Sequence, residues 1–170
     1  MLSRPYNTHI PRTMITLNPP GASFGLRAAA VAIHDGHVLL QYAKQDGFWF
    51  LPGGRCELLE SAQSTIHREM YEELGVQVCI KRLLWVLENF FVEDHVACHE
   101  LGLYFLIDLG PEFAHYDPGH SFERDEDGLE LTFCWFPIDA LHTIRLYPTF
   151  LQDALADLPE HVEHVVHQGE

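Results

Sequence analysis

The sequence predicts one α/β domain of the sandwich type, and three observations lead to this prediction. The chain has 170 residues, close to the size of a single domain, and 47% of them are hydrophobic, which is enough to build a core. Its apolar segments have the periodicity of strands and of at least one helix. They follow one another as strands, helix, strands and helix, which fits a sheet covered by helices better than a doubly wound parallel sheet.

The first strands are predicted around a tight turn. Residues 26–33 and 37–42 are apolar runs of strand composition, and Asp35-Gly36 lies between them. Two such runs around an Asp-Gly pair are a strong hairpin signal, because glycine readily takes the positive φ that the turn requires. Residues 48–51 then lead, as the end of a further strand, into the glycine-rich loop Pro52-Gly53-Gly54.

Residues 61–74 are predicted to form a helix. Ser61 supplies an N-cap, and Gly75 follows at the position where a helix often ends in a left-handed residue. One face of this helix is apolar and is expected to pack on the core through Ala62, Ile66, Met70 and Leu74.

The second half of the chain is also rich in strand-forming residues. Residues 76–92 and 96–107 predict a second antiparallel pair that turns near Glu93-Asp94. Residues 108–128 are polar and acidic, and at about 20 residues they exceed the usual length of a loop, so they are either a functional flap or disordered. Three aromatic residues in this segment are hypothesised to close over the site: Phe113, Tyr116 and Phe122.

The last elements are a strand over residues 129–136, a short helix over 137–142 and an amphipathic helix over 148–158. The histidine-rich end of the chain is expected to fray and is assigned no function. The predicted organisation is an N-terminal extension (1–24), one domain (25–158) and a C-terminal tail (159–170).

The composition limits the classes of partner. The formal net charge is −15, and such a surface repels nucleic acid polymers. No apolar run is long enough to span a membrane, and the N-terminus lacks the pattern of a signal peptide. The four cysteines form no C-x-x-C pair and are expected to be reduced. We therefore expect a cytoplasmic protein with no membrane partner.

Three glutamates gather on one face of the predicted helix. Glu69, Glu72 and Glu73 stand at positions i, i+3 and i+4, so their carboxylates repel one another, and only Arg68 lies within the run to offset them. A divalent cation turns this repulsion into ligation. Oxygen-only ligands favour a hard ion, Mg²⁺ with Mn²⁺ as a substitute, over zinc.

The spacing around these glutamates has a wider pattern. Gly54, five residues, Glu60, seven residues and then Arg68-Glu69-Met70-x-Glu72-Glu73-x-Gly75-Val76 match the Nudix box at every defined position. The chain thus resembles a small bacterial-type Nudix hydrolase. The resemblance implies an α/β/α sandwich with a mixed central sheet and a loop–helix–loop metal site. It also implies cleavage, by water attack at phosphorus, of a nucleoside diphosphate linked to another moiety.

The resemblance assigns roles to the matching residues. Glu69, Glu72 and Glu73 are the implied metal ligands, together with the backbone carbonyl of the glycine pair at Gly54. Glu69 and Glu73 are also the implied catalytic residues that activate water. An ion pair between Arg68 and Glu60 is implied to hold the loop–helix–loop and to aim Glu69.

Other site residues are predicted outside the box. Extra acids that assist the metal or act as a base are sought at Glu100, Glu126 and Glu130, although acids on strands and loops are usually solvated. Four aromatic residues are candidates for stacking on a base: Phe48, Trp49, Phe90 and Phe91.

The box does not encode the substrate. The markers of coenzyme A, ADP-ribose and NADH pyrophosphatases are absent, so a nucleoside di- or triphosphate is the first expectation. A nucleotide sugar or a dinucleoside polyphosphate is the alternative. A non-catalytic nucleotide-binding regulator and an isopentenyl-diphosphate-type isomerase are both disfavoured, because the box is intact. Many family members form homodimers, and the sequence marks no interface for one.

Overall fold

The computed structural model describes residues 11–44, 47–111, 113–126 and 129–169. The strands are β1 (Thr16–Leu17), β2 (Ala22–His34), β3 (His37–Ala43), β4 (Trp49–Phe50), β5 (Gly53–Arg55), β6 (Cys79–Glu93), β7 (Val96–Asp108), β8 (Ser121–Glu126), β9 (Leu129–Pro137) and β10 (Glu163–Gln168). The helices are α1 (Ala62–Leu74), the 3₁₀ helix η1 (Ile138–Thr143) and α2 (Leu151–Ala154).

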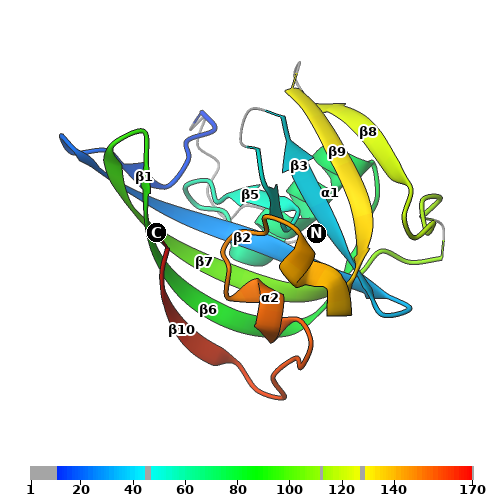
Figure 1. Cartoon of the computed structure of the whole chain (residues 1–170). Helices are drawn as coiled ribbons and strands as arrows, with labels where there is room; N and C mark the ends of the chain where they lie inside the picture. Colours follow the sequence, from blue (N-terminus) through cyan, green and yellow to red (C-terminus); the bar gives the residue numbers. More distant parts are fainter. Residues whose placement is uncertain (1–10, 45–46, 112, 127–128, 170) are drawn as a thin grey trace.

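Within the described ranges the strands form one mixed sheet. Its main path runs β10-β6-β7-β2-β3-β9-β8, while β1 and β5 pair with β2 and β4 pairs with β3. The pairs β2–β7 and β10–β6 are parallel, and the other pairs are antiparallel. Figure 1 shows α1 and α2 on opposite sides of this sheet. The predicted α/β sandwich is confirmed.

Strand β2 separates two hydrophobic clusters because successive side chains point to opposite faces. Ala28, Ala30 and Ala32 belong to the cluster that contains Ile66 and Met70 of α1. Ala29 and Val31 belong to the other cluster, which is completed by Leu141 of η1, Leu151 of α2 and Leu155 directly after α2. Small residues in β2 let both layers pack closely on the sheet.

Helix α1 and the first hairpin have the predicted signals. The Ser61 side chain accepts a hydrogen bond from the backbone N–H of Ser64 at 3.1 Å, and Gly75 ends the helix with φ 73°. Asp35 and Gly36 both have positive φ, as a two-residue hairpin turn requires. The predicted helix and hairpin are therefore confirmed.

Three predictions for the rest of the chain are wrong. The tail does not fray, because β10 pairs in parallel with β6 from Glu163 to Gln168. Part of the segment over 108–128 is neither flap nor disordered, since β8 pairs with β9 there. The helix expected over 148–158 is only the single turn α2.

The three aromatic residues of that segment do not close over a site. Phe113 is buried in the cluster under α1, and Tyr116 and Phe122 pack against the same cluster. The indole N–H of Trp135 donates to the backbone carbonyl of His115 at 2.7 Å, which ties the segment to β9. These side chains are core, because an aromatic residue in a polar segment still gains most by leaving water.

The segment before β2 docks on the loop that precedes α1. The N–H of Ile15 donates to the carbonyl of Cys56 at 2.8 Å, and the N–H of Leu58 donates to the carbonyl of Thr13 at 2.7 Å. This docking brings Arg12 beside α1. In the part of the chain that the structure describes, no helix has the length and apolar character needed to cross a bilayer.

Candidate active site

The glycine pair of β5 lies directly against α1. Gly53 has φ 134°, and a Cβ there would overlap the carbonyl oxygen of Ala28 on β2. A Cβ on Gly54 would overlap the carboxylate of Glu69. Gly53 therefore requires glycine, whereas at Gly54 a larger residue would have to displace the buried Glu69 carboxylate.

Arg68 gathers the carboxylates next to this glycine pair. Its Nε and Nη2 donate to the two oxygens of Glu60, each at 3.0 Å, which is the bidentate geometry of strong arginine–carboxylate pairs. Its Nη1 donates to Glu69 at 2.5 Å and to Glu72 at 3.1 Å. The ion pair between Arg68 and Glu60 that the sequence predicts is present.

Two carboxylates of this cluster, Glu60 and Glu69, have opposite pKa shifts. Burial by itself raises the pKa of Glu60, but hydrogen bonds from Arg68, from the backbone N–H of Glu57 and from Thr65 bring it below its ordinary value. Burial also raises the pKa of Glu69, and the opposing effect of Arg68 is smaller there.

Arg12 and Glu57 complete the cluster, and the sequence analysis found neither. The guanidinium of Arg12 pairs with Glu57, which is almost fully buried, and with Glu72 at 3.2 Å. Glu57 also lies 3.6 Å from Arg68. The position of Glu57 inside the box, three residues after Gly54, was the available signal. Arg12 had none, because it is 45 residues from Glu57 in the chain.

Glu73 lies on a different side of α1 from the arginines. It is buried, and its Oε1 accepts a hydrogen bond from the side-chain amide of Gln41 on β3 at 3.0 Å. Glu69 and Glu72 are thus placed together around Arg68, while Glu73, one turn beyond Glu69, contacts Gln41 of the sheet.

The chemistry of this donor set fits a hard divalent cation. The side chains gathered around Arg68 offer carboxylate oxygens, from Glu57, Glu60, Glu69 and Glu72. In the described residues, no three such side chains are already arranged around one ion position. Arginine guanidinium groups neutralise the carboxylates instead, so an ion that binds here replaces part of this charge.

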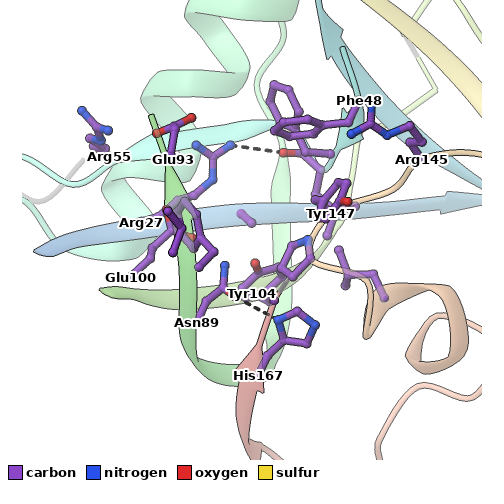
Figure 2. Close-up of a pocket in the computed structure, with 18 residues that line it drawn as sticks. Arg27, Phe48, Arg55, Asn89, Glu93, Glu100, Tyr104, Arg145, Tyr147 and His167 are labelled. Carbon is purple, nitrogen blue, oxygen red and sulfur yellow. Dashed lines mark hydrogen bonds between the residues drawn. The ribbon is translucent and has the colours of Figure 1, made fainter. Parts of the chain in front are cut away.

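A cavity of about 510 Å³ lies on the face of the sheet opposite α1 (Figure 2). Its walls are aromatic on one side, from Phe48, Phe50 and Tyr147, and its floor includes the buried Tyr104. Three arginines line it: Arg27, Arg55 and Arg145. Arg27 joins the cavity to the glycine pair, because its Nη2 donates to the carbonyl of Gly53 at 2.9 Å.

Two of the four predicted stacking residues line this cavity. Phe48 and Phe91 are part of its wall. Phe90 instead stacks on His99 with ring centroids 4.3 Å apart, and Trp49 packs edge-on against Phe136. Neighbouring residues of a strand point to opposite faces, so Phe90 and Phe91 do not line one cavity together.

The predicted extra acids are spread over the molecule. Glu100 lines the cavity from β7. Glu130 is exposed on β9, and its strand neighbour there is Asp125 of β8. Glu126 ends β8, and its side chain is outside the described part of the structure.

The sequence analysis missed much of the cavity wall. Asn89, Arg145 and His167 come from β6, the turn after η1 and β10, which no local motif connects. His167 was assigned to a frayed tail, although the pair Val165-Val166 beside it is typical of a strand.

Comparisons with known proteins agree with this arrangement. A family model described as NUDIX domain matches residues 25–158. The low-salt glycan biosynthesis protein Agl8 of Haloferax volcanii is 33% identical over 126 residues, which cover 68% of this chain and 78% of that protein. Human diphosphoinositol polyphosphate phosphohydrolase 2 is 24% identical over 127 residues, which cover 72% of this chain and 71% of that protein.

Solved structures share the fold. An ADP-ribose pyrophosphatase from Streptococcus suis has a TM-score of 0.55 at 24% identity, with 84% of this chain and 98% of that chain covered. A MutT protein from Bacillus halodurans has a TM-score of 0.58 at 16% identity, with 84% of this chain and 89% of that chain covered.

Proposed function

Because the chain belongs to the Nudix family and is a hydrolase of acid anhydrides, we propose that it cleaves a phosphoanhydride bond in a nucleoside di- or triphosphate with the help of Mg²⁺. The observation that carries the proposal is the cluster of carboxylates around Arg68, which lies against Gly54 and is connected through Arg27 to a cavity of about 510 Å³. Attack by water at phosphorus is the proposed chemistry.

We propose Glu69, Glu72 and Glu73, with the backbone carbonyl at Gly54, as the residues that hold Mg²⁺, for which Mn²⁺ is a substitute. When bound, the ion neutralises phosphate charge and lowers the pKa of water. Glu69 and Glu73 are both buried, which favours a role in accepting the proton from the attacking water. Arg68, held by Glu60, keeps the Glu69 carboxylate in place through its Nη1.

The cavity arginines explain how an acidic chain binds an acidic substrate. The formal net charge of −15 repels a polyphosphate at long range. Arg27 and Arg55 are Cα partners on β2 and β5, and both line the cavity beside the glycine pair. We propose that they bind phosphate oxygens that extend from the cavity toward Glu69.

A nucleotide sugar is the second candidate substrate. Its support is the length of the cavity, which runs from Arg55 past Tyr104 to Leu151 of α2, together with the name of the Haloferax relative, which refers to glycan biosynthesis. A dinucleoside polyphosphate remains a further alternative. The four free cysteines and the lack of a spanning helix among the described residues support the proposal of a cytoplasmic location.

Glu69→Gln tests the proposal. The amide keeps the volume of the side chain and removes its charge, so we expect kcat to fall by about two orders of magnitude or more while the fold is kept. Turnover is measured with Mg²⁺ on nucleoside di- and triphosphates, nucleotide sugars and dinucleoside polyphosphates, with products separated by chromatography. Circular dichroism checks the fold.

Glu123→Gln is the matched control, because Glu123 is an exposed glutamate on β8 outside the site. It should keep wild-type turnover. A Glu69→Gln variant with wild-type kcat would contradict the assignment of Glu69. If the wild type binds nucleotides and cleaves none of the panel, the chain is a nucleotide-binding regulator and not an enzyme of this kind.

A further inference from the structure

The side chain of Asn89 is held in the cavity wall by the C-terminal strand. Asn89 on β6 and His167 on β10 are direct Cα partners, although they are 78 residues apart in the chain. The side-chain oxygen of Asn89 lies 2.9 Å from Nδ1 of His167. Asn89 is buried and lines the cavity.

The contact with Asn89 sets which nitrogen of the His167 ring carries hydrogen. The amide oxygen of Asn89 has no hydrogen to donate, so the 2.9 Å contact requires a hydrogen on Nδ1 of His167. The other nitrogen, Nε2, lies 2.9 Å from the hydroxyl of Thr149 and accepts its hydrogen. Burial also lowers the pKa of His167, which favours the neutral ring that this pair of hydrogen bonds needs.

The amide nitrogen of Asn89 is consequently free to serve a ligand. Its oxygen faces His167, and Figure 2 shows the nitrogen turned to the other side. Among the described residues no protein acceptor is assigned to this NH₂ group. Because Asn89 lines the cavity, this NH₂ group can donate to an oxygen of a bound ligand.

The position of Asn89 relative to the box indicates which part of a substrate it meets. Strands β2 and β7 lie between β5 and β6, and at about 4.8 Å per strand this separates the two by about 14 Å. This span is comparable with the length of an extended nucleoside diphosphate. With the phosphates at the glycine pair and Arg27, the base reaches the end of the cavity where Asn89 lies.

We propose that Asn89 is a specificity-determining residue, which donates a hydrogen bond to a ring carbonyl oxygen of the nucleobase, and that His167 is the residue that positions it. Guanine, uracil and thymine offer such an oxygen at the base-pairing edge, where adenine offers an amine. Phe48, Phe91 and Tyr147 line the same cavity and supply ring faces for stacking. Stacking does not discriminate between bases, because every base has a π-face. This inference rests on the proposed function and adds the substrate class, a nucleotide whose base has a ring carbonyl oxygen at the base-pairing edge.

Asn89→Asp is the first test. The carboxylate has the shape of the amide but only accepts hydrogen bonds. We compare kcat/KM for guanosine, uridine and adenosine forms of the substrate class that the enzyme cleaves. The wild type should prefer the guanosine or uridine form over the adenosine form by about tenfold or more, and Asn89→Asp should abolish or reverse this preference. An unchanged preference in a folded Asn89→Asp variant would overturn the inference.

His167 is tested with a matched pair of variants. Asn at this position keeps a nitrogen donor near the place of Nδ1, whereas Leu removes it. His167→Leu should therefore lose most of the preference between bases and His167→Asn should keep it. Equal preference in the two folded variants would contradict the positioning role, because a purely structural residue would change stability and not the ratio between substrates.

A binding measurement separates this inference from the proposed function. The affinities for GMP, UMP and AMP are measured by calorimetry without any turnover. If GMP or UMP binds about tenfold more tightly than AMP and Asn89→Asp removes the difference, the recognition is supported even when the panel of substrates shows no cleavage. Equal affinity of the wild type for all three nucleotides contradicts it, whether or not the enzyme hydrolyses nucleotides.

Discussion

Arg68 and Arg12 pair with the same group of carboxylates but differ in burial. The side chain of Arg68 is 16% exposed and that of Arg12 is 56% exposed. Both have a pKa raised above the ordinary arginine value. For Arg68, burial lowers the pKa, but pairing with Glu60 and Glu69 outweighs this effect. For Arg12, the main cause is its hydrogen bonds to Glu57 and Glu72. We therefore expect Arg68 to be a structural cation of the site and Arg12 to be the cation that an incoming ion displaces.

Removal of Arg68 and removal of Arg12 should therefore differ in their effects on stability and on Mg²⁺ affinity. Arg68→Ala leaves the buried Glu60 without its partner and should destabilise the fold by about 3 kcal/mol as well as reduce activity. Arg12→Ala should cost less stability and should raise the affinity for Mg²⁺ severalfold, because a positive charge 3.2 Å from Glu72 is lost. Urea unfolding and calorimetry with Mg²⁺ alone measure the two effects. Weaker Mg²⁺ binding by Arg12→Ala would show that Arg12 does not compete with the ion.

Gly54 offers a second prediction at this scale. A methyl group there displaces the Glu69 carboxylate, since the two would overlap. Gly54→Ala should reduce kcat about 100-fold, because a displacement of about 1 Å at a catalytic group has effects of this size. Gly25→Ala is the control, since a Cβ at Gly25 of β2 meets no atom within 4 Å. Similar kcat values for the two variants would mean that the position of Glu69 is unimportant.

The residues of the site also show how far a site is predictable from sequence. Glu60, Arg68 and Glu69 are close in the chain and belong to one loop and helix, so their spacing carries their geometry. Asn89 and His167 become neighbours only through the pairing of two distant strands. A histidine in a polar tail has no local mark of such a role, because the hydrogen bonds that define it come from β6 and from Thr149.

At the scale of elements, the loop between β5 and α1 has one strained residue. Leu59 has φ 67°, in the left-handed region that disfavours side chains with a Cβ, and its side chain is half-exposed. Leu58 is exposed to the same extent and has no positive φ. The two neighbouring leucines therefore separate backbone strain from the loss of a side chain.

Leu59→Gly should stabilise the protein by about 0.5–1 kcal/mol, because the relief of strain exceeds the added entropy of the unfolded chain. Leu58→Gly should destabilise it by a similar amount, since glycine there brings only the entropy cost. Denaturant midpoints of the two variants give the comparison directly. A destabilised Leu59→Gly variant would mean that the Leu59 side chain stabilises the loop more than its conformation costs.

The elements also show why part of the fold was predictable. The helix α1 and the hairpin at Asp35-Gly36 are specified by caps and turn residues within a few positions. The strands β8 and β10 are short, polar and at the two edges of the sheet, so their sequences lack the apolar alternation of an inner strand. Their conformation is decided by the partner strands β9 and β6.

For the molecule as a whole, the proposed chemistry is divided between the two faces of one sheet. The carboxylates around Arg68 come from α1 and the loop before it, and the cavity lies on the opposite face of the sheet beside α2. The pair of β2 and β5 connects them, since Arg27 lines the cavity and bonds the carbonyl of Gly53. A net charge of −15 is compatible with anionic substrates because the positive groups are concentrated at this connection.

The central position of β2 in the sheet has a consequence for how the protein unfolds. Its residues 27–29 pair with β7 on one edge and with β5 on the other, while their side chains alternate between the two hydrophobic clusters. Their amide hydrogens should exchange with solvent deuterium only through global unfolding, with the free energy found by denaturant titration. Amides of the edge strand β8 should exchange much sooner. If residues 27–29 exchange in this way, the cavity and the carboxylate cluster belong to a single cooperative unit, and neither is lost while the other persists.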